Sequence, residues 1–259
     1  MLSFTNGDIV RWLGEFFWPF LRTLALFSAA PLFSAVAIPV RARVALAGVI
    51  AIVLAPTVGQ SAPLSLSWAA MMLTLQQVLV GLAIGFAMQV ALTAMAVAGD
   101  FVGVQMGFGF AGLFDVQSRF QVPVMSDLFN LVGLLMFVTL NGHLILLGVL
   151  VKSFAVVPIA ADGALPPLGW HALAAAGGPL FEMGVWLALP VVAVLLAANL
   201  AVAVVSRVAP QINIMSVGFS LFMWVGLAAT IALVPFFAPA VAHMIDAGLA
   251  AAGAALRGG

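Results

Sequence analysis

Long apolar runs separated by short polar or proline-containing segments make up most of this chain. A helix needs about 20 apolar residues to cross the hydrocarbon core of a bilayer. The pattern predicts about six long hydrophobic helices, some of them kinked by proline, at approximately residues 16–40, 44–58, 68–99, 128–151, 183–206 and 213–237. The run at 68–99 is longer than a bilayer requires, so we expect it to tilt, break or project beyond the membrane.

The segments between these runs differ in character. Residues 107–127 form a central loop that is rich in glycine and phenylalanine. The proline-rich residues 153–182 are predicted to form a second loop, with a short surface helix around residues 170–176. The small residues after 237 are interpreted as a tail. We therefore treat residues 1–259 as a single integral membrane domain.

The first 22 residues are amphipathic and lack the positively charged start of a signal peptide, so we expect no cleavage. Arg11, Glu15 and Arg22 are spaced four and then seven residues apart, which places them on one face of a helix. Such a face is usually a polar stripe at the membrane surface. A face that docks to a partner subunit is the alternative.

The composition agrees with a membrane protein. Apolar residues make up 65% of the 259 residues and charged residues only 6%, whereas soluble domains carry about 25% charged residues. A soluble fold is excluded because too little polar surface would be available to cover it. The sequence therefore predicts an all-α membrane protein. Its orientation stays open because the basic residues divide almost equally between the two sides of six spans.

The candidate chemistry is sparse. The formal net charge is zero and the chain has no basic cluster, so we expect no nucleic-acid partner. No cysteine is present, which excludes disulfides and thiolate metal sites. The motifs GxSxG, HExxH and GxxxxGK[ST] do not occur. We therefore expect no catalytic residue, no metal site and no cofactor, and we do not expect an enzyme.

Glycines recur at four-residue spacing along the third run. Gly81 and Gly85 form one pair, and Gly99, Gly103 and Gly107 form a tandem series. This spacing lets helix backbones approach closely in a membrane, although some pairs arise by chance in a glycine-rich chain. Polar residues within the runs, such as Gln77 and His143, must find hydrogen-bond partners there. We interpret them as links between helices.

The most distinctive local sequence is SRVAPQINI at residues 206–214, followed by VGF at 217–219. Pro210 breaks the helix there, and Arg207 lies just before the break, where a positive charge favours the carbonyl end of the preceding helix. Gln211 and Asn213 can satisfy backbone groups that the break leaves free. Physical reasoning alone indicates a well-capped turn between two membrane helices.

The same run resembles the R-x-A-P-Q-x-N signature of the FliR family, whose members are components of the flagellar type III export gate. Two other stretches agree, namely residues 18–43, with WPF, APLF and IPVRAR, and residues 99–143, which end in LNGH. The resemblance covers nearly the whole chain in order. Two residues depart from the family pattern: Ser220 stands where the family usually has proline after GF, and Val116 stands where proline commonly follows Asp115.

The resemblance implies a structural and gating subunit of the flagellar type III protein-export channel. The expected location is the bacterial inner membrane, as a multi-pass protein of the flagellar basal body. Implied partners are FliP-type and FliQ-type subunits in a hetero-oligomeric helical assembly, with FlhB-type and FlhA-type export proteins and unfolded flagellar proteins as cargo. The alternatives are an export subunit of a virulence injectisome and a small-solute secondary transporter; the sequence SVGF after APQIN favours the flagellar branch.

The resemblance also implies a plug. In the family, a central loop of the R subunit closes the export pore, and by position this loop corresponds to residues 107–123. Its glycines would supply hinge freedom, its phenylalanines would seal the passage, and Asp115 could pair with Arg119 four residues later. The candidate plug residues are Gly107, Phe108, Gly109, Phe110, Gly112, Phe114, Asp115, Arg119 and Pro123.

Overall fold

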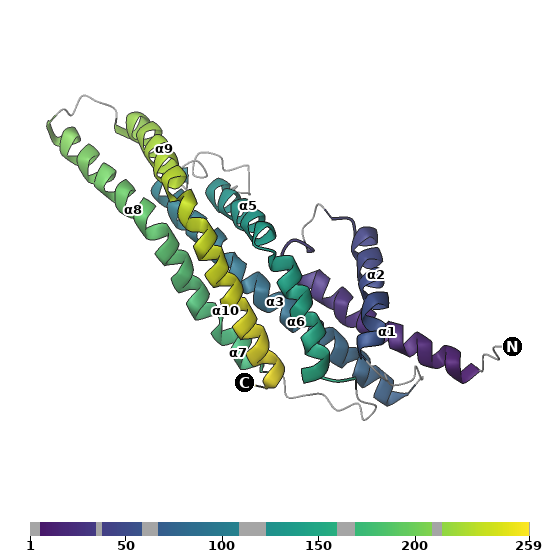
Figure 1. Cartoon of the computed structure of the whole chain (residues 1–259). Helices are drawn as coiled ribbons and strands as arrows, with labels where there is room; N and C mark the ends of the chain where they lie inside the picture. Colours follow the sequence, from purple (N-terminus) through teal and green to yellow (C-terminus); the bar gives the residue numbers. More distant parts are fainter. Residues whose placement is uncertain are drawn as a thin grey trace. The chain divides into compact units, whose positions relative to one another are not determined.

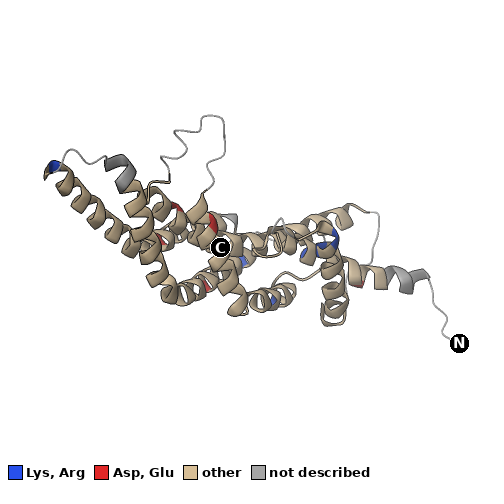
Figure 2. Cartoon of the chain, turned by 90° about the horizontal axis from the view of Figure 1, so that it is seen from above, with Lys and Arg blue, Asp and Glu red and all other residues tan. Residues whose placement is uncertain are grey.

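A computed structural model describes residues 6–34, 38–58, 67–108, 123–159, 169–208 and 214–258. Within these ranges every regular element is a helix, and none is a strand (Figure 1). Four helices in this part of the chain are long and apolar enough to cross a membrane, and one bent pair could supply a fifth. Charged residues are few along the described chain (Figure 2). The predicted all-α membrane fold is confirmed.

The chain groups into two compact units, each assembled from segments that are distant in sequence. The first unit comprises Met1–Ala91, Asn141–Gly177 and Ile245–Gly259, and the second comprises Leu92–Leu140 and Gly178–Met244. Two helices contribute to both units: α3 (Trp68–Gln105) divides after Ala91, and α10 (Phe237–Arg257) divides after Met244. No simple N-terminal and C-terminal halves therefore exist.

The first unit contains α1 (Asn6–Ala29), α2 (Val40–Val58), α6 (Gly142–Val156), α7 (Trp170–Ala175) and the neighbouring parts of α3 and α10. Helix α2 packs against both α1 and α6. The core of the first unit includes four almost completely buried side chains, those of Trp18, Leu26, Phe27 and Ile84. The short helix expected around residue 170 is confirmed as α7.

The second unit contains α5 (Val124–Thr139), α8 (Gly177–Val208), α9 (Ile214–Leu233), the single-turn 3-10 helix η1 (Val234–Phe236) and the remaining parts of α3 and α10. Its buried core includes Met95, Met106 and Phe137. The rings of Phe129 and Phe237 lie 5.1 Å apart and join α5 to α10. This unit carries both ends of the central loop.

Helix α3 is one unbroken helix of 38 residues. At 1.5 Å per residue it is about 57 Å long, against about 30 Å for the hydrocarbon core. A break is one of the three ways in which the long third run could fit a membrane, and the structure excludes it. The excess length must therefore be accommodated by a tilt of α3 in the bilayer or by its projection beyond the bilayer.

The first helix ends earlier than the expected span of 16–40. Helix α1 stops at Ala29, two residues before Pro31, so that this proline lies outside the helix. The residue that precedes a proline is disfavoured in helical conformation, which explains the end of α1 here. Leu32 follows in the left-handed region, with φ of 70°.

The expected span at 128–151 is divided. Helices α5 and α6 meet at a bend of 66°. Asn141 lies at the bend in the left-handed conformation, with φ of 56°, which asparagine tolerates better than most residues. The sequence around this bend contains no proline, and for that reason the apolar pattern predicts one continuous helix.

The interpretation of the residues after 237 as a tail is wrong. They form the 21-residue helix α10, which ends at Arg257. Ala252 and Ala255 are buried, and a Cβ added to Gly248 would lie 3.1 Å from the sulfur of Met88 in α3. The small side chains at this end of the chain therefore permit close helix contact.

Candidate functional site

The base of the central loop is a tightly packed pair of antiparallel helices. Helix α3 leads into the loop, and α5 leads out of it. A Cβ added to Gly99 would clash with the backbone of Met125 and lie 2.6 Å from the Cα of Ser126. The hydroxyl of Ser126 donates a hydrogen bond to the carbonyl of Ala96 at 2.8 Å. The two helices therefore touch through their backbones at this end.

The contact continues towards the loop at Gly103. A Cβ added there would lie 3.3 Å from the Cβ of Met125. Gly103 is only five residues from Phe108, and Met125 is only two residues from Pro123. The two ends of the segment 109–122 consequently leave from neighbouring points on one helix pair.

A third helix joins this base. Met106 is 1% exposed, and a Cβ added to Gly226 of α9 would lie 2.6 Å from its Cγ. The ring of Phe108 meets the ring of Phe219 in α9 edge to face, with 6.3 Å between the centroids. Helices α3, α5 and α9 thus surround the place where the chain enters the loop.

Gly107 terminates α3 in a conformation that favours glycine. Its φ is 86°, in the left-handed region, and its backbone N–H donates to the carbonyl of Val104 at 3.1 Å. A left-handed glycine is a common way to end a helix, because other residues are strained there. The position directs the chain from α3 into the loop.

The substitution Gly107→Ala is expected to lower the free energy of unfolding by about 1 kcal/mol, because a Cβ strains the left-handed backbone. Thermal unfolding of the purified full-length chain in mild detergent measures this. Gly253→Ala is the matched control: Gly253 lies inside α10, and a Cβ there meets no atom within 4 Å. That variant should be neutral or slightly more stable. Equal losses in the two variants would contradict a special backbone role for Gly107.

Besides Gly107 and Phe108, Pro123 is the candidate plug residue that lies within the described ranges; it is exposed and precedes α5. Its carbonyl accepts a hydrogen bond from the N–H of Asp127 at 2.9 Å. The candidate residues that fall outside the described ranges are Gly109, Phe110, Gly112, Phe114, Asp115 and Arg119 in the loop, and Pro210, Gln211 and Asn213 in the turn. Arg207 lies in the last turn of α8 and is exposed.

The first glycine pair of the third run lies against α1 in the first unit. A Cβ added to Gly81 would clash with the carbonyl of Arg22 and lie 2.8 Å from the Cβ of Ala25. A Cβ added to Gly85 would lie 2.6 Å from the carbonyl of Leu26. Because glycine has no Cβ, α3 and α1 can approach until their backbones are in contact at both positions.

The same contact encloses a charge that the sequence interpretation placed at the surface. Arg22 is completely buried, so its assignment to a polar stripe or an exposed docking face is wrong. Its guanidinium donates to the Oε1 of Gln77 at 2.8 Å, to the Oγ of Ser153 at 3.0 Å and to the carbonyl of Val157 at 2.8 Å. The group also lies 4.1 Å from the centre of the Phe154 ring.

The Arg22 cluster connects three segments of the first unit. Gln77 belongs to α3, Ser153 to α6, and Val157 is the residue that caps α6. Gln77 in turn donates to the side chain of Gln76 at 3.1 Å. The interpretation of polar residues as links between helices is confirmed for Gln77. The sequence signal for the cluster is an arginine at the edge of an apolar run, and that signal does not identify its partners.

Comparisons with known proteins agree on one family. A profile described as "Bacterial export proteins, family 1" matches residues 13–248. The chain is 39% identical over 246 residues to the flagellar biosynthetic protein FliR of Escherichia coli K12, covering 95% of this chain and 94% of the relative. The chain belongs to the FliR family. It is also 30% identical over 219 residues to the Bacillus subtilis 168 protein of the same name, covering 83% and 84% of the two chains.

The FliR-family match spans both units of the fold. The matched residues 13–248 include the base of the central loop and every member of the Arg22 cluster. The resemblance that the APQIN turn suggested is therefore confirmed. The chain is an α-helical membrane protein of a bacterial export family.

Proposed function

We propose that this chain is a structural and gating subunit of the flagellar type III protein-export channel in the bacterial inner membrane, at the flagellar basal body. It performs no chemistry. Its cargo is unfolded flagellar protein, and its partners are FliP-type and FliQ-type subunits, together with FlhB-type and FlhA-type export proteins. The names of the FliR relatives favour the flagellar apparatus over a virulence injectisome.

The observation that carries the gating role is the geometry of the loop base. The ends of segment 109–122 are held together by the contacts of Gly99 and Gly103 with Met125 and Ser126. A chain of this length, fixed at both ends to one place, can reach at most about 24 Å from its base. Its phenylalanines supply apolar surface and its glycines supply conformational freedom. A segment so anchored can close a pore without displacing the helices that hold it.

The gating role is tested by replacing residues 109–122 with a Gly-Ser linker of equal length, while Gly107, Phe108 and Pro123 are retained. The assembled gate should then conduct ions in the resting state, because the apolar side chains that block the passage are gone. Ion flux into cells or proteoliposomes that carry the assembly measures this.

The same replacement at residues 160–168, between α6 and α7, is the matched control and should leave the gate closed. Resting conductance equal to that of the wild type in the 109–122 variant would overturn the plug. Assembly membership is tested separately, by mass spectrometry of subunits that co-purify in mild detergent. FliP-type and FliQ-type subunits are expected, and a lone chain would overturn the assignment.

The flagellar and injectisome alternatives are separated by deleting the gene. Loss of motility with effector secretion intact is the expected result. The opposite pattern would place the chain in an injectisome.

A further inference from the structure

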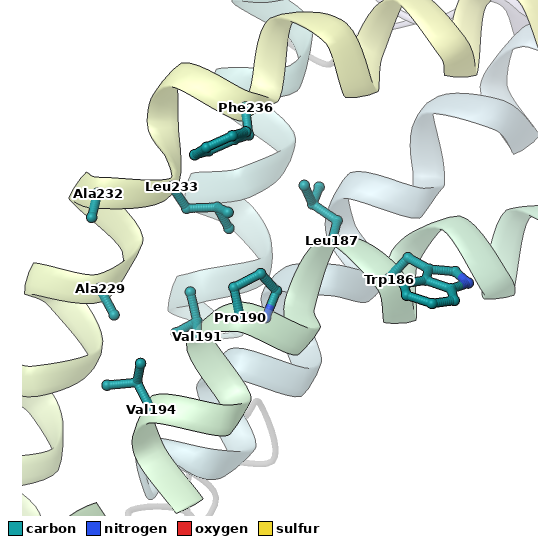
Figure 3. A pocket seen from close by; sticks show the side chains of 9 residues that line it. All are labelled: Trp186, Leu187, Pro190, Val191, Val194, Ala229, Ala232, Leu233 and Phe236. Atoms are coloured by element: carbon teal, nitrogen blue, oxygen red, sulfur yellow. The ribbon is translucent and has the colours of Figure 1, made fainter. Parts of the chain in front are cut away.

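An apolar cavity of about 410 Å³ lies between α8 and the α9–η1 segment of the second unit. Leu187, Pro190 and Val191 of α8 face Ala229, Leu233 and Phe236 across it (Figure 3). Its volume lies within the range of roughly 300–1,000 Å³ that is common for ligand pockets. All of these side chains are hydrocarbon, so the cavity suits an apolar occupant.

A second cavity, of about 470 Å³, shares Trp186 and Leu187 with the first. It adds two ionisable side chains, Glu182 from α8 and His243 from α10, both of which are exposed. The two cavities therefore form one groove with an apolar end and a polar end. We call it the α8 groove.

The α8 groove exists because both of its walls are irregular. Pro190 lies inside α8, where a proline has no backbone N–H to donate and its ring crowds the carbonyl four residues earlier. On the other side, η1 interrupts the helical path between α9 and α10. Ala229 and Ala232 add little volume at the same level. The two helices therefore do not close on each other as they would with regular backbones and larger side chains.

The length of the groove matches one leaflet of a bilayer. From Glu182 to Val194 the helical rise of α8 is about 18 Å, close to half of the hydrocarbon thickness of about 30 Å. Trp186 is 66% exposed and lies near the polar end. Exposed tryptophan is characteristic of the membrane–water interface. The polar end therefore corresponds to the interface and the apolar end to the depth of one leaflet.

We propose that the α8 groove binds one phospholipid, with an acyl chain between Pro190, Val194 and Phe236 and an ammonium head group beside Glu182. A carboxylate attracts an ammonium group and repels a head group of net negative charge. The helices on either side belong to candidate spans whose apolar 18-residue stretches are only 17% and 22% buried within the described chain. The groove thus faces the surroundings in which such a lipid is available. This site does not depend on the proposed export function.

Native mass spectrometry of the full chain, purified with its partners in mild detergent, tests the site. The probes are phosphatidylethanolamine and phosphatidylglycerol, added at equal concentration. Ala229→Phe places a ring in the cavity, and retention of phosphatidylethanolamine should fall about tenfold, the change expected when about two methylene groups lose their contacts. Ala228→Phe is the matched control, because Ala228 is exposed on the same helix and does not line the groove.

Glu182→Gln tests the head group at an exposed position, where the substitution leaves the fold intact. It should abolish the preference for phosphatidylethanolamine over phosphatidylglycerol while lipid is still retained. Wild-type retention in Ala229→Phe, or an unchanged preference in Glu182→Gln, would overturn the proposal. So would cross-linking of Ala232→Cys to a partner subunit at full occupancy, since a protein segment would then fill the groove. Co-purification of the export partners is unaffected by either result, so failure of the lipid site is distinguishable from failure of the export function.

Discussion

Replacing Arg22 with alanine is expected to lower the free energy of unfolding by about 3 kcal/mol or more, a larger loss than we expect from any of the glycine substitutions. The substitution removes a donor from three acceptors, on Gln77, Ser153 and Val157. Each buried acceptor left without a donor costs about 1–3 kcal/mol. The side chain also occupies volume at the centre of the first unit, so a cavity adds to the loss.

The substitution Arg22→Lys separates charge from geometry. Lysine keeps the positive charge, but it replaces a planar group that carries donors in several fixed directions with a compact one. One acceptor lies on α3 and two lie at the end of α6, in different directions from the guanidinium, so a lysine can satisfy only part of the set. We expect an intermediate loss of stability, with α6 held less firmly against α3.

Thermal unfolding of the full-length chain in mild detergent measures both Arg22 variants. Arg41→Ala is the matched control, because Arg41 is exposed at the start of α2. That variant should change the stability by no more than about 0.5 kcal/mol. If Arg22→Ala and Arg41→Ala unfold at the same temperature, the buried cluster contributes nothing to stability and the prediction is wrong.

The substitution Gly99→Ala is expected to have the second largest effect, a loss of about 1–3 kcal/mol. The new methyl group would meet the backbone of Met125 and Ser126, and a backbone cannot move aside as a flexible side chain does. Helix α5 must shift, which breaks the bond from Ser126 to Ala96. The shift also displaces Pro123, where the chain returns from the loop.

Gly148→Ala is the control for this substitution. Gly148 is exposed in α6, and a Cβ there meets no atom within 4 Å. That variant should be neutral or more stable by up to about 1 kcal/mol, since alanine is the better helix former. Unfolding temperatures in detergent and resting ion conductance of the proposed gate are the two measurements. A Gly99→Ala variant that matches Gly148→Ala in both would show that the close approach of α3 and α5 is unimportant.

The sequence was sufficient for the helical membrane class and for the family, because apolar run length and the APQIN turn are local signals. It failed where the outcome depends on distant partners. Nothing in the residues around Arg22 indicates Ser153 or Val157, which lie more than 130 positions later. Charged residues are rarely buried completely, so the interpretation of Arg22 as a surface residue followed the general rule.

Two further failures have a common physical cause. The 66° bend at Asn141 contains no proline, and the last helix is built from small residues that suggest a tail. Hydrophobic periodicity indicates burial but neither the direction of a helix nor the space available beside it. The glycine spacing likewise predicted close helix contacts, but it did not show that α1 and α5 are the helices that α3 contacts.

The division of the two units has a consequence for how this protein is made. The first unit draws on α1 at the start of the chain and on residues of α10 near its end, and Gly169 depends on Ala255 for a hydrogen bond. The ribosome synthesises the chain from its N-terminus, so the packing of the early helices cannot be completed until α10 has been made. Contacts between residues so far apart in sequence form slowly. Until they form, the glycine-lined faces of the early helices are exposed to other proteins. Biogenesis of this subunit therefore favours assistance or capture by neighbours during synthesis.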